Sequence, residues 1–229
     1  MTSVPDITSF AVSQLSGVNG ASTDYTFTVT SPLPHFSTDK IVFTFPSEIT
    51  VPSSVTCATV SNVGAVSCSV SGSTLTAVFT FSGGTLAAST AFSFKVSSIT
   101  NPPSTEPTSS FSNVEMQDTS SGKLAGFSGT VTVTDTTPAT ITTSSLSQEV
   151  LTLSTATTYT ITYTTMNAMA SGGSFKVTYP SSVTPGSSIT TCNVIYNSVT
   201  YAMSGCTLDT TNSIISIPTG FTQAVAKGD

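Results

Sequence analysis

Short runs that alternate polar and apolar residues recur along almost the whole chain, and no other pattern constrains the fold as strongly. Successive side chains of a β-strand point to opposite faces, so a half-buried strand shows this period of two. Turn-forming residues such as Ser82-Gly83-Gly84 separate the runs, and no stretch has a sustained helical period. The clearest runs are residues 25–29, 41–45, 74–81, 92–96, 130–133 and 159–163. Many short strands at this spacing predict an all-β sandwich or barrel.

The chain also repeats itself, because landmarks of its first half return in the second. Tyr25 matches Tyr159, and residues 43–47 (Phe-Thr-Phe-Pro-Ser) match residues 177–181 (Val-Thr-Tyr-Pro-Ser). The sequence therefore predicts two tandem Ig-like antiparallel β-sandwich modules, at residues 1–135 and 136–229. The second copy ends where the first continues into about three more strands. We expect a continuation of the chain, or a neighbouring subunit, to complete it.

Composition excludes several classes of function. Only 7% of the residues are charged, the net charge is −6, and there is no arginine. Such a chain cannot neutralise a phosphate backbone, so we expect no nucleic-acid partner. A single histidine leaves little imidazole chemistry, and no acidic cluster has the spacing of a dedicated calcium loop. We therefore expect no enzyme, no cofactor and no metal site, with a weak calcium site at Asp135 as the lesser alternative.

The cysteines fall two per module, and pairing within each module is the simplest of the three possible connectivities. Each bridge would close a short loop and contribute about 3 kcal/mol in the chain-entropy model. The spacing does not suit a zinc site, which needs closely spaced cysteine or histidine pairs. Structural disulfides indicate an oxidising compartment, so we expect an extracellular or cell-surface location. The predicted pairs are Cys57–Cys68 and Cys192–Cys206.

Two further segments contain residue types that could support recognition. His35 lies in a proline-rich loop between two predicted strands, where we expect an exposed side chain without a role. Residues 196–201 begin and end with tyrosine, and Met203 follows them between the second pair of cysteines. This segment could be an exposed recognition tip, although a buried strand pair is the favoured interpretation.

Hydroxyl side chains occupy the surface that charges fill in most proteins. The chain has 87 Ser and Thr residues and no Asn-x-Ser/Thr sequon. Dense Ser and Thr with interspersed Pro suits O-glycosylation, whereas Thr on strand faces also follows from its β propensity. Covalent glycans would help a chain of so few charges to stay soluble. The candidate acceptors are Ser104, Thr105, Thr108, Thr136 and Thr137.

The N-terminal residues show no targeting pattern. The first six residues have neither a basic nor an apolar region of a signal peptide. No run approaches the roughly 18 apolar residues that a transmembrane helix needs. Because the composition nevertheless suits an extracellular protein, we expect the chain to be an excerpt of a longer secreted one.

A resemblance accompanies these patterns. The elements Tyr25-x-Phe27, Phe43-Thr44-Phe45-Pro46, Cys57…Cys68 and Ile99-Thr100-Asn101-Pro102 resemble tandem Ig-like repeats of very large surface proteins of ciliates and other protists. The second module departs from the pattern, because it has no counterpart of Asn101-Pro102. Such repeats form stalks, adhesins and extracellular fibres, and the resemblance implies a role of that kind.

The resulting functional prediction is an extracellular structural protein, the repeating unit of a glycosylated filament or surface stalk. Its expected partners are copies of itself or adjacent modules of a longer chain. The alternative is a cell-surface adhesin that binds glycans or a protein partner. If subunits exchange strands, the second module is the expected acceptor. The residues of the candidate donor strand are Ile7, Phe10, Val12 and Leu15.

Overall fold

The computed structural model describes residues 4–152, 155–165, 167, 173–185, 189, 191–196 and 198–218. The chain divides into two compact units, unit 1 (Met1–Ala139) and unit 2 (Thr140–Asp229). The predicted boundary at 135/136 differs from this division by four residues. Thr136 and Thr137 both donate their N–H groups to the carbonyl of Gly17, which holds them in unit 1.

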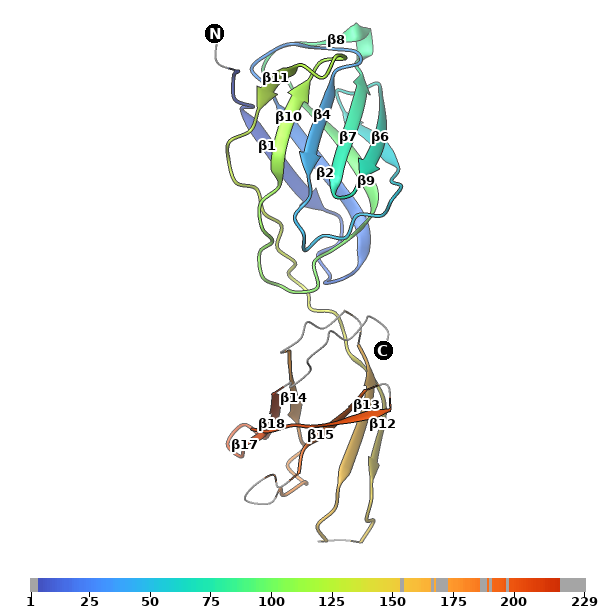
Figure 1. The fold of residues 1–229 in the computed structure, drawn as a ribbon, viewed down its shortest axis with the longest axis vertical. Coiled ribbons are helices and arrows are strands. Elements are labelled where there is room, and N and C mark those ends of the chain that lie inside the picture. The colour runs from blue at the N-terminus through green and yellow to red at the C-terminus, as the bar shows by residue number, and fades with distance from the viewer. Residues whose placement is uncertain are drawn as a thin grey trace. The chain divides into compact units, whose positions relative to one another are not determined.

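The described residues form β-strands and one short 3-10 turn, so the expectation of an all-β protein is confirmed. Unit 1 contains two antiparallel sheets (Figure 1). The first sheet has the order β1 (Ser9–Gln14), β2 (Ser22–Thr30), β9 (Ala91–Thr100), β5 (Cys57–Ser61). The second has the order β11 (Lys123–Gly126), β10 (Ser112–Gln117), β4 (Lys40–Thr44), β7 (Thr74–Thr80), β6 (Ala65–Ser71). A small ladder joins β3 (His35–Phe36) to β8 (Thr85–Leu86).

The two sheets of unit 1 pack face to face over an aromatic core. Strand β2 alternates buried and half-buried residues, as a strand with one core face must. The Phe27 ring lies 5.3 Å from that of Phe94 in the same sheet and 4.7 Å from that of Phe43 in the other. Burying each such side chain contributes about 1.5–3 kcal/mol. The predicted β-sandwich is therefore confirmed for unit 1.

A tight turn fixes how β6 and β7 meet. Their register pairs Ser71 with Thr74, which leaves Gly72 and Ser73 as a two-residue loop. Gly72 has a φ of 59°, a conformation that glycine adopts without strain. Two-residue loops of this kind with a positive φ at the first position match the twist of the flanking strands, so the turn sets the register of the whole hairpin.

Unit 2 contains three small antiparallel sheets among its described residues. Strand β12 (Thr142–Gln148) pairs with β13 (Tyr159–Thr164), and β15 (Asn193–Tyr196) pairs with β16 (Val199–Ala202). The third sheet has the order β14 (Ser174–Thr178), β18 (Ile214–Pro218), β17 (Thr207–Asp209). The ring of Tyr163 lies 4.8 Å from that of Phe175.

The strand pairing in unit 2 parallels that in unit 1. The first two strands of each unit form an antiparallel pair, β1–β2 in one and β12–β13 in the other. The order β14-β18-β17 then corresponds to β4-β7-β6. Unit 1 also contains β9, the strand that joins β2 to β5, together with β10 and β11.

Candidate functional site

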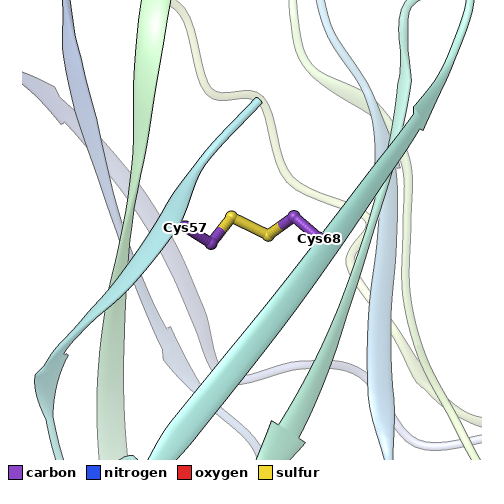
Figure 2. The surroundings of a disulfide bond; sticks show 2 residues. All are labelled: Cys57 and Cys68. Atoms are coloured by element: carbon purple, nitrogen blue, oxygen red, sulfur yellow. A yellow bond between two sulfur atoms is a disulfide. The ribbon is translucent and has the colours of Figure 1, made fainter. Parts of the chain in front are cut away.

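A disulfide joins the two sheets of unit 1 along one side of the sandwich. Cys57 begins β5, the last strand of the first sheet, and Cys68 lies in the middle of β6, the last strand of the second. Their Cα atoms are 5.9 Å apart, and Figure 2 shows the bridge between the two strands. Both half-buried cysteines pack against the hydrophobic core. The disulfide therefore holds the ends of two different sheets together.

Strand β6 forms the outer edge of its sheet, as Figure 1 shows. All seven of its residues pair with β7 in one unbroken register. Its side chains alternate between half-buried and exposed positions. The half-buried side chains, those of Val66, Cys68 and Val70, pack against the core, and the exposed ones are those of Ala65, Ser67, Ser69 and Ser71.

The hydrogen bonding of β7 identifies which backbone groups of β6 remain free. In an antiparallel sheet, residues that bond to one neighbouring strand alternate with residues that bond to the other. The N–H of Phe79 donates to the carbonyl of Asp39, so the odd-numbered residues of β7 bond toward β4. The even-numbered residues of β7 therefore bond toward β6, where they meet its odd-numbered residues. The N–H and C=O groups that point away from β7 are those of Val66, Cys68 and Val70.

The two large sheets of unit 1 have four edges, and of these β11 is short and β5 is irregular. Strand β1 is six residues long and regular, and across a groove it faces residues 132–136, where Thr136 donates its N–H to the carbonyl of Gly17 beyond the strand's end. Strand β11 has four residues and includes the charged Lys123. Strand β5 has a register shift between Thr59 and Ser61. Strand β6 is the longest of the four at seven residues, it is regular, free of proline and uncharged, and a disulfide fixes it to the other sheet, so it is the kind of edge that accepts another strand.

A second candidate is a shallow groove between the end of β1 and residues 132–136. Asp135 lies beneath it with 1% of its surface exposed, and its Oδ1 accepts a 2.5 Å hydrogen bond from Nε2 of Gln14. Asp135 Oδ2 and Gln14 Oε1 are buried without a hydrogen-bond partner. Burial raises the pKa of Asp135, although the bond from Gln14 opposes this shift. This pair is suited to a neutral acid rather than to a cation site, which needs more oxygen ligands.

The expectation of an exposed His35 is wrong, because its side chain is 1% exposed. The chain reverses direction after β3, and this reversal brings Asp39 Oδ2 to 3.2 Å from His35 Nδ1. The same oxygen accepts a hydrogen bond from the N–H of Phe36. Burial lowers the pKa of His35, against the influence of Asp39. No three His, Cys, Asp or Glu side chains gather at a metal-binding distance in the part of the chain that the structure describes.

The candidate glycosylation residues divide by exposure. Ser104, Thr105, Thr136 and Thr137 are exposed. Thr108 is 4% exposed, and its hydroxyl accepts a hydrogen bond from the N–H of Val133. A glycan on that hydroxyl has no room, so Thr108 does not fit the proposed role.

The candidate donor strand is part of the fold of its own unit. Strand β1 pairs with β2 over six positions. Ile7 and Phe10 are each 3% exposed and belong to the core, Val12 is half-buried against it, and Leu15 is 82% exposed. Donation of this strand would open the core of unit 1, so its geometry gives no support to an exchange.

The predicted tyrosine segment forms a hairpin from β15 and β16. Cys192 and Cys206, whose Cα atoms are 6.4 Å apart, are bonded beyond its base. The side chains of Tyr196 and Tyr201 are half-buried, whereas Ile195 is 66% exposed. Asn197, between the strands, lies outside the described residues. The aromatic rings therefore do not form an exposed recognition tip.

Comparison with known proteins gives a structural match that is too distant to support an argument. No protein-family model and no curated protein matches this chain. A solved structure, a non-cellulosomal cohesin from the hyperthermophilic archaeon Archaeoglobus fulgidus, is similar over 54% of this chain and 89% of its own. The sequence identity is 12% and the TM-score is 0.35, values that carry no argument about function. The resemblance to protist surface repeats accordingly rests on short motifs.

Among the residues that the structure describes, none forms a helix able to span a membrane.

Two features of unit 1 escaped the sequence analysis. Asn101 organises a loop from inside, because it accepts a 2.8 Å hydrogen bond from the Tyr25 hydroxyl and donates to the carbonyls of Ser16 and Val18. The second feature that the sequence did not predict is the free edge of β6. Its signal in the sequence is a run of alternating Ser and Val around Cys68 without charge or proline, but strand order decides which run lies at an edge.

Proposed function

We propose that this chain is a non-catalytic module of an extracellular or cell-surface protein, which binds other proteins by adding a strand to β6. The observation that carries the proposal is the bare edge of β6. Three residues present free N–H and C=O groups there, and the strand is regular, uncharged and seven residues long. Main-chain hydrogen bonds supply the affinity in this mode of recognition, and pockets for alternate side chains supply specificity.

The disulfide supports this use of the edge. Binding loses affinity when a flexible surface must first become ordered, so a preorganised strand binds more tightly. Cys68 anchors the middle of β6 to β5, and the turn at Gly72 fixes its register against β7. The disulfides also support the extracellular location, because they persist in oxidising compartments. The role of a filament subunit is the second candidate, because the donor strand that it was expected to use pairs with β2 and contributes to the core of unit 1.

Binding of synthetic peptides tests the proposal. The probes are peptides of alternating Val and Thr or Ser, each about ten residues long, on an array exposed to the labelled full chain. We expect a subset of them to bind, and the double substitution Val66→Pro, Val70→Pro to weaken that binding at least tenfold. Proline removes the two outward N–H groups while leaving the bonds to β7, because edge strands tolerate proline at such positions.

The matched control is the double substitution Ser67→Ala, Ser69→Ala, which changes side chains of the same strand and leaves its outward backbone groups intact. We expect it to bind the same peptides as the unchanged chain. The proposal is overturned if no peptide binds, or if the proline variant, shown to be folded by circular dichroism, binds as well as the unchanged chain.

A further inference from the structure

The five central residues of β6 read the same in both directions. From residue 66 to residue 70 it is Val-Ser-Cys-Ser-Val, with Cys68 at the centre. A strand of this kind can pair antiparallel with a copy of itself about a two-fold axis at Cys68. Val66 then lies opposite Val70 of the second copy, and Ser67 lies opposite its Ser69.

We propose that the strand added to β6 is β6 of a second copy of this chain, paired antiparallel about Cys68. The inference rests on the proposed function, and it names the partner at that same edge. The contact would join two five-stranded sheets into one continuous sheet. Two-fold contacts of this kind are self-complementary and common in homodimers.

The backbone groups fit this register. Val66, Cys68 and Val70 are the residues of β6 whose N–H and C=O groups point away from β7. In the proposed register, each of these residues lies opposite another member of the same set. Opposed residues of that kind exchange both of their hydrogen bonds in an antiparallel ladder. A register shifted by one residue would place a residue with free N–H and C=O groups opposite one whose groups already bond to β7.

The side chains fit the same register. Residues 66, 68 and 70 face the core side of the sheet, and residues 67 and 69 face the exposed side. Every opposed pair joins two even-numbered or two odd-numbered residues. Core-facing side chains of one copy therefore lie beside core-facing side chains of the other, and exposed ones beside exposed ones. A Val–Val pair across two strands contributes about 0.2–1 kcal/mol, and β6 contains no charge to oppose itself.

The expected complex is a weak and closed dimer. One added strand gives an interface at the small, transient end of the range for specific complexes. Because a two-fold contact uses the same surface on both copies, it is complete with two molecules and does not continue into a filament.

Charge substitutions at the exposed positions test the register directly. The lysine variant carries Ser67→Lys and Ser69→Lys, and the glutamate variant carries Ser67→Glu and Ser69→Glu. In the proposed dimer each variant places like charges directly opposite each other twice, whereas a mixture of the two places opposite charges together. Sedimentation equilibrium of the full chain, from about 10 μM to about 1 mM, measures the association.

We expect the unchanged chain to dimerise, each charged variant alone to lose at least tenfold in dimer affinity, and the mixture to regain it as a heterodimer. The control Thr119→Lys, Ser120→Lys adds the same charge at an exposed turn and should dimerise like the unchanged chain. Dimers that both charged variants keep would overturn the proposal, because another surface would then form them. The same is true of a mixture that fails to associate.

The failure of this inference can be distinguished from failure of the proposed function. A chain that stays monomeric up to about 1 mM but binds extended peptides through β6 refutes self-pairing and retains the binding role. A chain that does neither refutes both proposals.

Discussion

Asp135 is a buried carboxyl whose surroundings favour its neutral form. Its raised pKa results first from burial, against the hydrogen bond from Gln14. A group whose pKa is higher in the folded state stabilises the fold fully below its unfolded value, and this stability is lost as the pH rises through the folded value. Unit 1 is therefore less stable at pH 7 than it would be with a neutral side chain at this position.

The substitution Asp135→Asn tests this account. We expect it to raise the free energy of unfolding of unit 1 by about 1 kcal/mol at pH 7, because asparagine removes the negative charge whose burial raises the pKa of Asp135. The gain should shrink toward pH 3, where Asp135 is protonated in both states. Thermal unfolding of the two proteins across this range gives the difference. A gain that does not vary with pH would contradict the assignment.

His35 has the opposite pH dependence. Burial depresses its pKa below the usual 6.5, so the ring is neutral in the folded protein at pH 7. Stability from such a group is present above its unfolded pKa and is lost as the pH falls through that value toward the folded one. We expect the stability of unit 1 to decline from about pH 6.5 downward.

The His35→Gln variant should lack this decline, although it should be less stable at pH 7 by about 1–3 kcal/mol because it changes a buried hydrogen bond with Asp39. Urea unfolding at pH 7.5, 6.5 and 5.5 separates the two effects. Parallel losses of stability in both proteins on acidification would show that another group is responsible.

At the scale of elements, the disulfide between β5 and β6 constrains the strand proposed to bind. Its loop spans a sequence separation of 11 residues, so the chain-entropy model gives a contribution of about 3 kcal/mol. The pair Cys57→Ser, Cys68→Ser should lower the free energy of unfolding of unit 1 by this amount and speed amide exchange throughout β6. The control pair Cys192→Ser, Cys206→Ser opens the other disulfide. Equal exchange in β6 for both variants would mean that the bridge does not hold the edge.

The elements were largely predictable from the sequence, and their order was not. The polar–apolar alternation with a period of two residues predicts β2, β4, β7 and β9, because each of these strands has one face in the aromatic core. The expected strand at residues 130–133 is absent, although this extended segment bonds through Val131 to Phe111. Burial of His35 depends on Asp39, which lies in the next turn, and local polarity does not reveal that contact. Edge position depends on which distant strands pair, so the role of β6 could not be inferred.

At the scale of the whole molecule, low charge distinguishes this surface. Net charge of −6 on 229 residues gives weak repulsion between copies, and β6 itself carries no charge. We therefore expect association to be nearly insensitive to salt, with a slight gain at high ionic strength where the repulsion is screened. Sedimentation in about 20 mM and about 500 mM sodium chloride measures this. A marked loss of association in high salt would indicate an ionic interface elsewhere.

Residue-by-residue amide hydrogen exchange along β6 of the full chain shows whether this edge is free in the monomer and covered by a second copy. In dilute protein, the amides of Val66, Cys68 and Val70 should exchange quickly because they face away from β7, and those of Ser67 and Ser69 should exchange slowly. Raising the protein concentration should slow the first three and leave the other two unchanged. If all five amides are equally protected in dilute protein, the edge of β6 is already occupied and the account is contradicted.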